Sequence, residues 1–507
     1  MAEVENLQKI VSHCKEYGFI FPSSEIYDNL GAVYDYGQFG VELKNNIKEY
    51  WWKSMVQMHE NIVGLDSAIF MHPTVWKASG HVDSFSDPLI DNKDSKKRYR
   101  ADVLLEEKID KLKEKGEKEL AKKNLSSATE EEKIKASRDY AKGVLLETEY
   151  TKAAEAADFK RYKELIEEYE IACEVSGSKN WTDVRQFNLM FGTKLGAVDE
   201  DATDLYLRPE TAQGIFVNFL NVQKTGRLKI PFGIAQIGKA FRNEIVARQF
   251  IFRMREFEQM EMQFFVRPGT QKEWFEKWKQ TRMNWHLALG TAQENLRFHV
   301  HEKLAHYADA AEDIQFKFPI GFKELEGIHS RGDFDLSQHQ KFSGKKLQYF
   351  DSEINENYVP YVIETSIGLD RMFLRVISES LKDEVLENGE TRTVLNLPPA
   401  FAPIKVAILP LLKKDGLPEK AREILNHLKF VGRTFYEEKD SIGKRYRRMD
   451  ALGTPYCITV DHQTLEDNTV TIRERDTMQQ DRIHMDEVAK IVGAKIDMNN
   501  LLRKAVG

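Results

Sequence analysis

The sequence predicts a mixed α/β (α+β) fold in which an antiparallel sheet flanked by helices precedes a C-terminal α/β module. Two observations support this prediction. Residues 230–266 form an apolar stretch with charged residues at its middle, which suits two antiparallel strands joined by a charged loop. Beyond residue 402, apolar runs of strand length alternate with amphipathic helical stretches, which is typical of an α/β module.

Length and composition indicate a large globular protein. The chain has 507 residues, of which 41% are hydrophobic and 31% charged, and a net charge of -7. This length predicts roughly three domains with ample cores. Its 3 cysteines are too few and too scattered for a disulfide framework, and no apolar run approaches the length of a membrane span. We therefore expect a cytoplasmic protein with no membrane partner.

The N-terminal part contains a helical pattern followed by a short strand pattern. Residues 37–58 have apolar residues at helical spacing, including the adjacent Trp51 and Trp52. Residues 67–71 suit a short strand that stops at Pro73. An ordinary buried helix and strand would have the same pattern, so this part alone indicates no function.

Residues from about 104 to 170 differ in character from the rest of the chain. They are rich in Lys, Glu and Ala, with few Gly or Pro, and opposite charges recur at helical-turn spacing. We predict an inserted pair of exposed helices. Because both charge signs are mixed, a solvated helical hairpin is favoured over a dedicated nucleic-acid arm, although a role in binding a partner stays open.

The charged loop within residues 230–266 has the residues needed to hold a nucleotide. Residues two apart on a strand share a face, so Arg242 and Glu244 point together, as do Arg253, Arg255 and Phe257. A guanidinium can bind phosphate oxygens bidentately, and a ring can stack on a base. The chain has no Gly-x-x-x-x-Gly-Lys-Ser/Thr pattern, so fixed arginines would have to neutralise the phosphates of ATP.

The C-terminal module is predicted from six consecutive patterns. Strands are expected at 404–411, 434–437, 456–461 and 469–475, and helices at 418–430 and 482–492. Within the module, Lys444, Arg445, Arg447 and Arg448 surround Tyr446, a combination suited to the backbone and bases of single-stranded RNA. A solvated helix face has the same composition, and both interpretations stay open.

Two motifs resemble a known class of enzymes. Phe241-Arg242-Asn243-Glu244, followed by Arg253-x-x-x-Phe257, is similar to the second signature motif of class II aminoacyl-tRNA synthetases. Ser366-Ile367-Gly368-Leu369-Asp370-Arg371 resembles their third motif, a strand running into a helix with an arginine near its start. Residues 37–73 resemble the first motif, which forms the dimer interface in that class. The C-terminal module resembles the anticodon-binding domain that several of these enzymes share.

Further segments resemble the class II synthetases that use one particular amino acid. Arg185 to Phe191 and Leu207 to Gly214 closely resemble glycyl-tRNA synthetases of the homodimeric type. Residues 98–102, 323–328 and 360–366 are also similar to that family, and only the charged insertion falls outside the resemblance. The resemblance implies a catalytic domain at 1–401, an anticodon-binding domain at 402–507 and a homodimer. It also implies a reaction that joins glycine to ATP as glycyl-adenylate and then to the 3′ end of tRNA(Gly).

Glycine presents only an ammonium, a carboxyl and two hydrogens. A selective pocket must therefore hold the amine and leave no volume for a side chain. Glu210, Glu261 and Glu364 are expected to form its acidic walls, and Ser366 a small polar edge. Arg100 is similar to a substrate-contacting arginine of the family.

The resemblance also implies an ATP site, with Arg242, Glu244 and Arg371 as catalytic residues. Arg242 would neutralise the α phosphate and Phe257 would stack on adenine, while Arg371 and Arg253 would hold the terminal phosphates. The expected ATP contacts are Arg242, Asn243, Glu244, Phe252, Arg253, Phe257, Glu324, Leu325, Gly368 and Arg371. Magnesium would share the charge, with Glu324 and Glu353 as candidate ligands.

Some bacterial relatives have a Cys-x-x-Cys zinc half-site where this chain has Cys173 and Ser176. With one cysteine and no nearby histidine, no structural zinc is expected. Two alternative functions are kept. A catalytically silent relative would usually lose the ATP arginines, and a ligase for another amino acid would differ around Glu210 and Glu364. Both sets of residues are present in this sequence.

Overall fold

The computed structural model describes residues 2–196, 202–245, 249–301 and 308–506. The chain forms two compact units. One comprises Met1–Ser79, Thr193–Phe241 and Arg248–Gly507, and the other Gly80–Gly192 and Arg242–Ala247. We describe each unit by itself.

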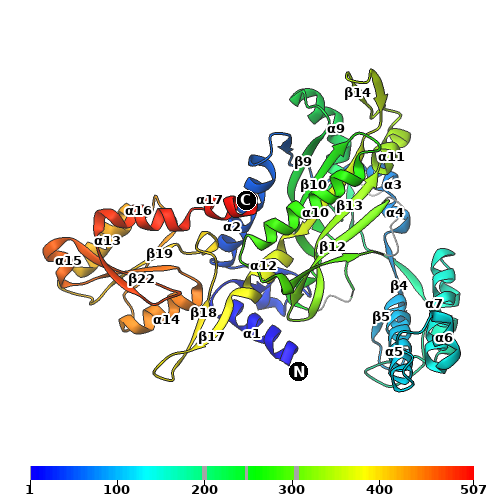
Figure 1. Ribbon diagram of the computed structural model, residues 1–507, viewed down its shortest axis with the longest axis horizontal. Coiled ribbons are helices and arrows are strands. Elements are labelled where there is room, and N and C mark those ends of the chain that lie inside the picture. The colour runs from blue at the N-terminus through cyan, green and yellow to red at the C-terminus, as the bar shows by residue number, and fades with distance from the viewer. Residues whose placement is uncertain (1, 197–201, 246–248, 302–307, 507) are drawn as a thin grey trace. The chain divides into compact units, whose positions relative to one another are not determined.

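Within the described residues, the first unit is built on a seven-stranded sheet (Figure 1). In spatial order the strands are β11 (Leu296–Val300), β12 (Ala310–Phe318), β13 (Gly321–Gly332), β16 (Tyr361–Gly368), β10 (Glu256–Val266), β9 (Phe232–Phe241) and β3 (Ile62–Gly64). Neighbours are antiparallel except β3, which pairs parallel to β9. The predicted antiparallel strands within residues 230–266 are therefore confirmed as β9 and β10.

Side chains of β10 alternate between the two faces of the sheet, so one face packs in the hydrophobic core and the other carries polar residues. Met260, Met262 and Phe264 are buried in the main hydrophobic cluster, against helices α10 (Gln271–Leu287) and α12 (Leu369–Ser380). Because side chains alternate along a strand, Glu261 and Gln263 point to the opposite face. Helices α9 (Ala212–Gly226) and α11 (Phe334–Ser343) contribute the apolar cover at one end of that face.

The N-terminal prediction is half right. The helix expected at 37–58 is α2 (Gly40–Trp52), continued by a π-helical turn at Lys53–Gln57. The strand expected at 67–71 is wrong, because the sheet strand is β3 and Pro73 begins helix α3 (Pro73–Ala78). Proline fits the first turn of a helix, where its missing N–H has no partner to lose.

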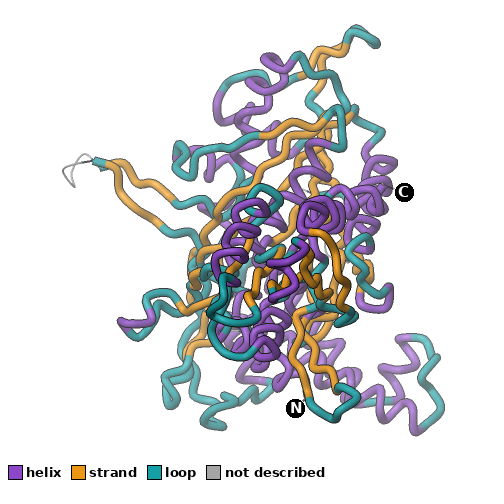
Figure 2. Tube along the Cα trace, turned by 90° about the vertical axis from the view of Figure 1, so that its left-hand side faces the viewer, coloured by secondary structure: helices purple, strands orange, loops and turns teal. Residues whose placement is uncertain are grey.

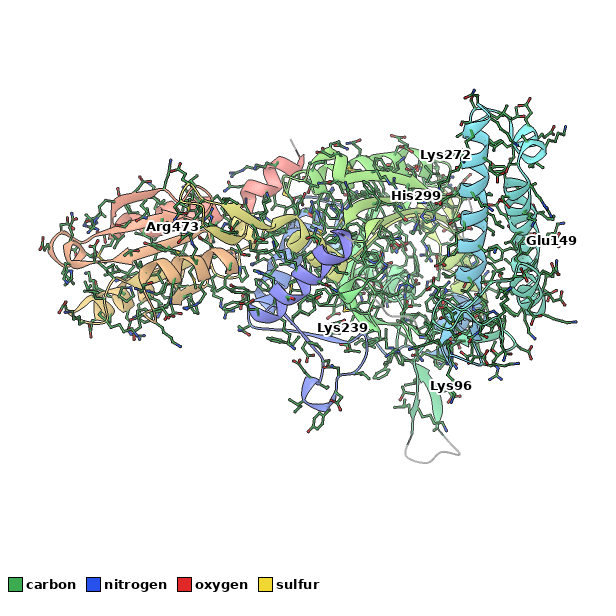
Figure 3. The ribbon with its side chains drawn as sticks, turned by 90° about the horizontal axis from the view of Figure 1, so that it is seen from below. Lys96, Glu149, Lys239, Lys272, His299 and Arg473 are labelled. Atoms are coloured by element: carbon green, nitrogen blue, oxygen red, sulfur yellow. The ribbon has the colours of Figure 1, made fainter. Side chains whose placement is uncertain are left out.

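The second unit contains the predicted charged helices and a small sheet. The helices are α5 (Ala101–Lys122), α6 (Glu130–Ala136), α7 (Arg138–Glu155) and α8 (Phe159–Glu168), and the strands are β4 (Ser86–Asp91), β5 (Arg98–Arg100) and β6 (Arg185–Asn188). Lys113 Nζ lies 2.6 Å from Glu147 Oε2, which joins α5 to α7 by an ion pair. Glu149 of α7, labelled in Figure 3, lies 3.6 Å from Arg161 of α8, and Leu146 on the same helix is buried.

The C-terminal module has a five-stranded sheet within the described residues. Its order is β20 (Thr434–Tyr436), β19 (Val406–Pro410), β21 (Tyr456–Val460), β22 (Thr469–Glu474) and β23 (Gln480–His484). The four predicted strands and the helix α13 (Leu417–Leu428) are confirmed to within two residues at most ends. The helix predicted at 482–492 begins later, as α16 (Met485–Ile496), because residues 480–484 pair with β22.

No described helix is long and apolar enough to cross a membrane. The two-stranded ribbon of β7 (Gly192–Leu195) and β8 (Thr203–Tyr206) is visible in Figure 2.

Candidate active site

Three polar residues form a row across the middle of the main sheet. Glu261 on β10 lies opposite Gln236 of β9 and opposite Ser366 of β16. Directly paired residues share a face, so the three side chains lie on the side away from the main core. The row continues into β13 at Gly327, where a Cβ atom would come within 3.0 Å of the His329 ring.

The structure brings Glu261 and Glu364 together beside this row. Both carboxylates accept a hydrogen bond from the same nitrogen, Gln263 Nε2, and each N···O distance is 2.7 Å. Thr211, directly before α9, donates its hydroxyl to Glu261. Both acids are buried, with 2% and 5% exposure, respectively.

Glu364 is bound by two basic side chains of β13. Arg331 Nη1 donates to Glu364 Oε2 at 2.7 Å, and His329 Nδ1 lies 2.7 Å from Glu364 Oε1. Although burial opposes ionisation, these partners hold the pKa of Glu364 well below its usual range. Glu364 in turn raises the pKa of His329 against the effect of burial.

Glu210 joins the same network through Gln213. Gln213 Nε2 donates to Glu210 Oε1 and to Asp335 Oδ1, both at 2.9 Å, and Asp335 is bound by Arg331. Burial, followed by the charges of Glu364 and Glu210, raises the pKa of Glu261 well above its usual value. The predicted acidic trio therefore forms one cluster on this face.

The expected strand-to-helix motif is present at the end of β16. Gly368 ends the strand and precedes the first residue of α12, which places Arg371 in the first turn of the helix. Arg371 Nη1 lies 3.0 Å from Glu324 Oε1 of β13. Arg371 Nε donates to the carbonyl of Phe252 at 3.3 Å.

The neighbours of Arg371 correct part of the expected ATP set. Its guanidinium lies 4.5 Å from the centroid of the Phe252 ring, which is itself buried. Leu325 is 0% exposed within the core, so its side chain cannot contact a nucleotide. Phe257 lies on the same strand face as Glu261 and is partly buried. Arg253 forms no hydrogen bond or ion pair with any residue that the structure describes.

The two candidate magnesium ligands, Glu324 and Glu353, lie far apart along the sheet. Glu353 Oε2 lies 3.0 Å from Arg267, which directly follows the last residue of β10. Arg371 and Glu324 are at the other end, near Gln259, which pairs with Gly368. Eight residues of strand separate Gln259 from Arg267, or roughly 26 Å. Among the described residues, no group of three or more His, Cys, Asp or Glu could hold a metal ion.

Four further predicted residues, Arg100, Arg242, Asn243 and Glu244, belong to the second unit. Arg100 lies 2.6 Å from Asp102 and 3.2 Å from Asp87, and these acids together with Glu244 raise its pKa against the effect of burial. Arg242 lies over the Phe85 ring at 5.4 Å from the centroid, and the backbone N–H of Asn243 donates to the carbonyl of Leu189 at 2.8 Å.

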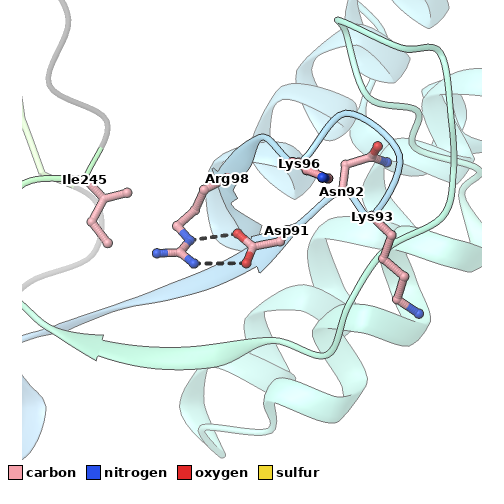
Figure 4. Close-up of a pocket in the computed structure, with 6 residues that line it drawn as sticks. All are labelled: Asp91, Asn92, Lys93, Lys96, Arg98 and Ile245. Atoms are coloured by element: carbon pink, nitrogen blue, oxygen red, sulfur yellow. Dashed lines mark hydrogen bonds and ion pairs between the residues drawn. The ribbon is translucent and has the colours of Figure 1, made fainter.

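A basic hollow of about 370 Å³ in the same unit is shown in Figure 4. It is lined by Asp91, Asn92, Lys93, Lys96, Arg98 and Ile245. Arg98 is held by Asp91 through two hydrogen bonds, at 2.7 Å and 3.0 Å.

Cys173 is buried among hydroxyl groups. Its Sγ lies 3.3 Å from Ser95 Oγ and 3.1 Å from the hydroxyl of Tyr99. Burial alone would raise the pKa of the thiol, but hydrogen bonds with Ser176, Ser95 and Tyr99 lower it to about 6. Ser176 Oγ also donates to Asn92 Oδ1 at 3.2 Å, so polar side chains surround the thiol. The absence of structural zinc stays a prediction.

The structure corrects the basic run of the C-terminal module, which lies on α14 (Ile442–Leu452). Arg445 is 2% exposed and donates to the backbone carbonyls of Pro410, Leu411 and Glu437, so it is not available to RNA. Tyr446 is partly buried, and the guanidinium of Arg473 lies over its ring at 4.8 Å from the centroid.

Arg448 on the same helix is bound by Glu437 at 2.6 Å and by Asp440 at 2.8 Å. Lys444 and Arg447 remain as exposed or partly exposed cations, and Arg447 lies 3.9 Å from Asp450. Both line two surface hollows, of about 600 Å³ and 490 Å³, on either side of α14.

Sequence reasoning missed four residues of the acidic cluster: Gln236, Gln263, His329 and Arg331. A signal for one of them exists, because Gln263 continues the polar positions of an otherwise apolar strand at a spacing of two. The positions of Gln236, His329 and Arg331 in the cluster depend on which strands pair. A single sequence does not reveal this pairing.

Comparison with protein families defines the class first. Residues 191–380 match the tRNA synthetase class II core domain (G, H, P, S and T), and residues 405–495 match an anticodon binding domain. Residues 87–189 match glycyl-tRNA synthetase insertion domain 1. This range contains the insertion predicted at about 104–170, so the insertion is also part of the family resemblance. The fold is that of a class II aminoacyl-tRNA synthetase with an anticodon-binding domain.

Curated relatives then identify the family. The glycine–tRNA ligase of Chlorobaculum tepidum is 52% identical over 97% of this chain and 100% of its own length. Those of Geobacillus thermodenitrificans and Treponema denticola are 48% and 47% identical, each over 97% of both chains. This chain belongs to the glycine–tRNA ligase family.

Proposed function

We propose that this protein activates glycine with ATP to glycyl-adenylate and transfers the glycine to the 3′ end of tRNA(Gly). Family membership supports the overall reaction. The single structural observation that supports the amino-acid substrate best is the convergence of Glu210 with the buried Glu261 and Glu364 on one face. Buried acids attract an ammonium strongly, and a crowded face leaves no room for a side chain.

The glycine site is proposed to consist of Glu210, Glu261, Glu364, Ser366 and Arg100. Ser366 is in the same row as Glu261 and accepts a hydrogen bond from Gln259 at 3.4 Å. A small hydroxyl at this position gives a polar edge without filling the space next to the α carbon.

The two chemical steps need charge stabilisation more than a side-chain nucleophile. In the first, a glycine carboxylate oxygen attacks the α phosphorus and pyrophosphate leaves. Arg242 neutralises the α phosphate, and Arg371 with Arg253 holds the terminal phosphates. Phe257 stacks on adenine, while Asn243, Glu244 and Gly368 complete the nucleotide contacts. Phe252 acts by supporting the guanidinium of Arg371.

Magnesium is proposed as the partner of ATP. Mg²⁺ prefers oxygen ligands and usually takes one or two carboxylates together with substrate phosphates. Glu324 fits this chemistry, because its carboxylate is partly exposed next to Arg371. Magnesium bound there would lower the charge of the triphosphate, while Arg371 orients both the carboxylate and the phosphates.

The residues proposed to contact tRNA are Lys444 and Arg447, which line the hollows beside α14. We propose that residues 402–507 bind the anticodon region and that residues 1–401 perform catalysis. We also propose that the protein is a cytoplasmic homodimer. Three exposed apolar residues near the N-terminus, Ile26, Tyr27 and Leu30, are suited to contact a second copy.

A charging assay tests the proposal directly. Purified protein is expected to attach labelled glycine to tRNA(Gly) only when ATP is present. A catalytically silent RNA-binding relative would bind tRNA(Gly) without consuming ATP, and this result would overturn the proposed function.

A further inference from the structure

The acids of the proposed glycine site differ in their charge compensation. Glu364 has two basic partners, Arg331 and His329, each with a nitrogen 2.7 Å from its carboxylate. Glu261 has only neutral donors, the Thr211 hydroxyl and the Gln263 amide. Glu261 forms no ion pair within the described part of the chain, although it is 2% exposed.

An ionised carboxylate in such a place is costly, because water is excluded and no cation among the described residues forms an ion pair with it. The largest charge effect on Glu261 comes from Glu364, which has the same sign, and the charge of Arg331 opposes it more weakly. Glu364 accepts a hydrogen bond from the same nitrogen as Glu261, the Nε2 atom of Gln263. Two carboxylates that share a site do not both ionise easily, and the one with cationic partners keeps the negative charge.

Two unpaired amide atoms next to Glu261 indicate that this face is built to receive a ligand. Gln236 Nε2 and Gln263 Oε1 are buried and have no hydrogen-bond partner among the residues that the structure describes. Buried polar atoms rarely remain unpaired unless a ligand or water completes them. One is a donor and the other an acceptor, which suits a ligand with both a carboxylate and an ammonium.

This inference rests on the proposed function. We infer that Glu261 carries a proton while the site is free of glycine and releases it when the ammonium of glycine arrives. The carboxyl O–H bond of Glu261 breaks, its proton passes to the buffer, and the carboxylate forms an ion pair with the ammonium. Glu364 stays ionised throughout and acts as a positioning residue, because Arg331 and His329 already neutralise it.

The pKa of Glu261, raised by burial and by the neighbouring acids, supports this assignment. Glycine is therefore expected to bind more tightly as the pH rises through that pKa, because the proton competes with the ammonium. The charged or titratable groups around Glu261 come from four places in the first unit: Glu364 on β16, His329 and Arg331 on β13, Asp335 on α11, and Arg208 and Glu210 before α9.

Calorimetry of the full-length protein tests the inference. Glycine is titrated at one pH in two buffers that differ in enthalpy of ionisation. Binding heats that differ between the buffers by up to one released proton per site are expected. Binding with the same heat in both buffers would overturn the inference. The absence of any glycine binding would instead contradict the proposed function.

The Glu261→Gln variant shows whether the released proton comes from Glu261 or from His329, whose pKa is also shifted. The variant keeps the shape of the protonated side chain but has no proton to release. We expect about 10- to 100-fold weaker glycine binding, without proton release. Glu273→Gln, a change in an exposed residue of α10, is the matched control and should behave as the unmodified protein. Continued proton release by Glu261→Gln would overturn the inference.

Discussion

Arg331 and Glu364 form a buried ion pair, with Nη1 and Oε2 2.7 Å apart. The same guanidinium binds Asp335 at 2.8 Å, so it links β16 to the start of α11. Because Glu364 also accepts from Gln263, the pair fixes the geometry of the proposed ammonium site while it stabilises the sheet.

Arg331→Ala is expected to lower both stability and glycine activation. Removing one partner of a buried pair leaves an uncompensated charge, which costs about 3–5 kcal/mol. Urea unfolding followed by tryptophan fluorescence would show an earlier midpoint. Arg503→Ala, a change in an exposed arginine of α17 (Asn499–Val506), is the control. An unchanged midpoint for Arg331→Ala would contradict the role of this pair.

Arg242→Ala is expected to abolish adenylate formation in a folded protein. Loss of the charge proposed to face the α phosphate should lower pyrophosphate exchange by at least about 100-fold. Arg242→Lys keeps the charge without the bidentate geometry and should recover part of the rate. Near-normal exchange by the alanine variant, with an unchanged circular dichroism spectrum, would refute this role.

Replacing both Lys444 and Arg447 with alanine should weaken tRNA binding without affecting glycine activation. We expect the KM for tRNA in charging to rise about 10-fold at moderate salt. Lys413 and Lys414, both exposed in the same module, provide a double-alanine control with the same change in charge. Equal effects of the two double variants would indicate general electrostatics rather than a contact surface.

Arg445→Ala should act on folding instead of on RNA binding. Its guanidinium satisfies the carbonyls of Pro410, Leu411 and Glu437 in a buried position. We expect a loss of about 2–5 kcal/mol in the stability of the module. The thermal unfolding temperature measures this, and an unchanged temperature together with a raised KM for tRNA would restore the RNA-binding role.

Stability should fall on mild acidification because of His286. This residue lies 2.8 Å from Glu326, and burial lowers its pKa from 6.5 to about 4. The unfolded chain takes up a proton near pH 6.5, but the folded chain does so only near pH 4. Stability is therefore lost as the pH falls through this window, by about 3 kcal/mol from this residue. His286→Gln should reduce the pH dependence of the unfolding midpoint between pH 6.5 and 4.5.

The sequence was sufficient to predict the parts that depend on local pattern. The β9–β10 pair and the strand-to-helix turn at Gly368 follow from apolar spacing and short motifs. The strand predicted at 67–71 failed because Pro73, interpreted as the end of a strand, is the first residue of helix α3. Arg445 failed because exposure on a helix depends on the neighbouring strands, which composition does not reveal.

Contacts between distant strands could not be predicted. Arg331 reaches Glu364, and Glu353 lies away from Glu324, because of the order in which β13, β16 and β10 pair. The boundary at 401–402 stays a proposal. One hydrophobic cluster contains Ile47 of α2 together with Leu409 and Leu501. Deleting residues 402–507 would therefore expose buried surface of the catalytic part, and point variants test the division better.

The most direct measurement is exchange of labelled pyrophosphate into ATP as a function of the amino acid. The account predicts exchange with glycine and little with alanine or serine, because the proposed site around Glu261 and Ser366 is expected to exclude an added methyl or hydroxymethyl group. No exchange with glycine, or equal exchange with alanine, would contradict the central claim.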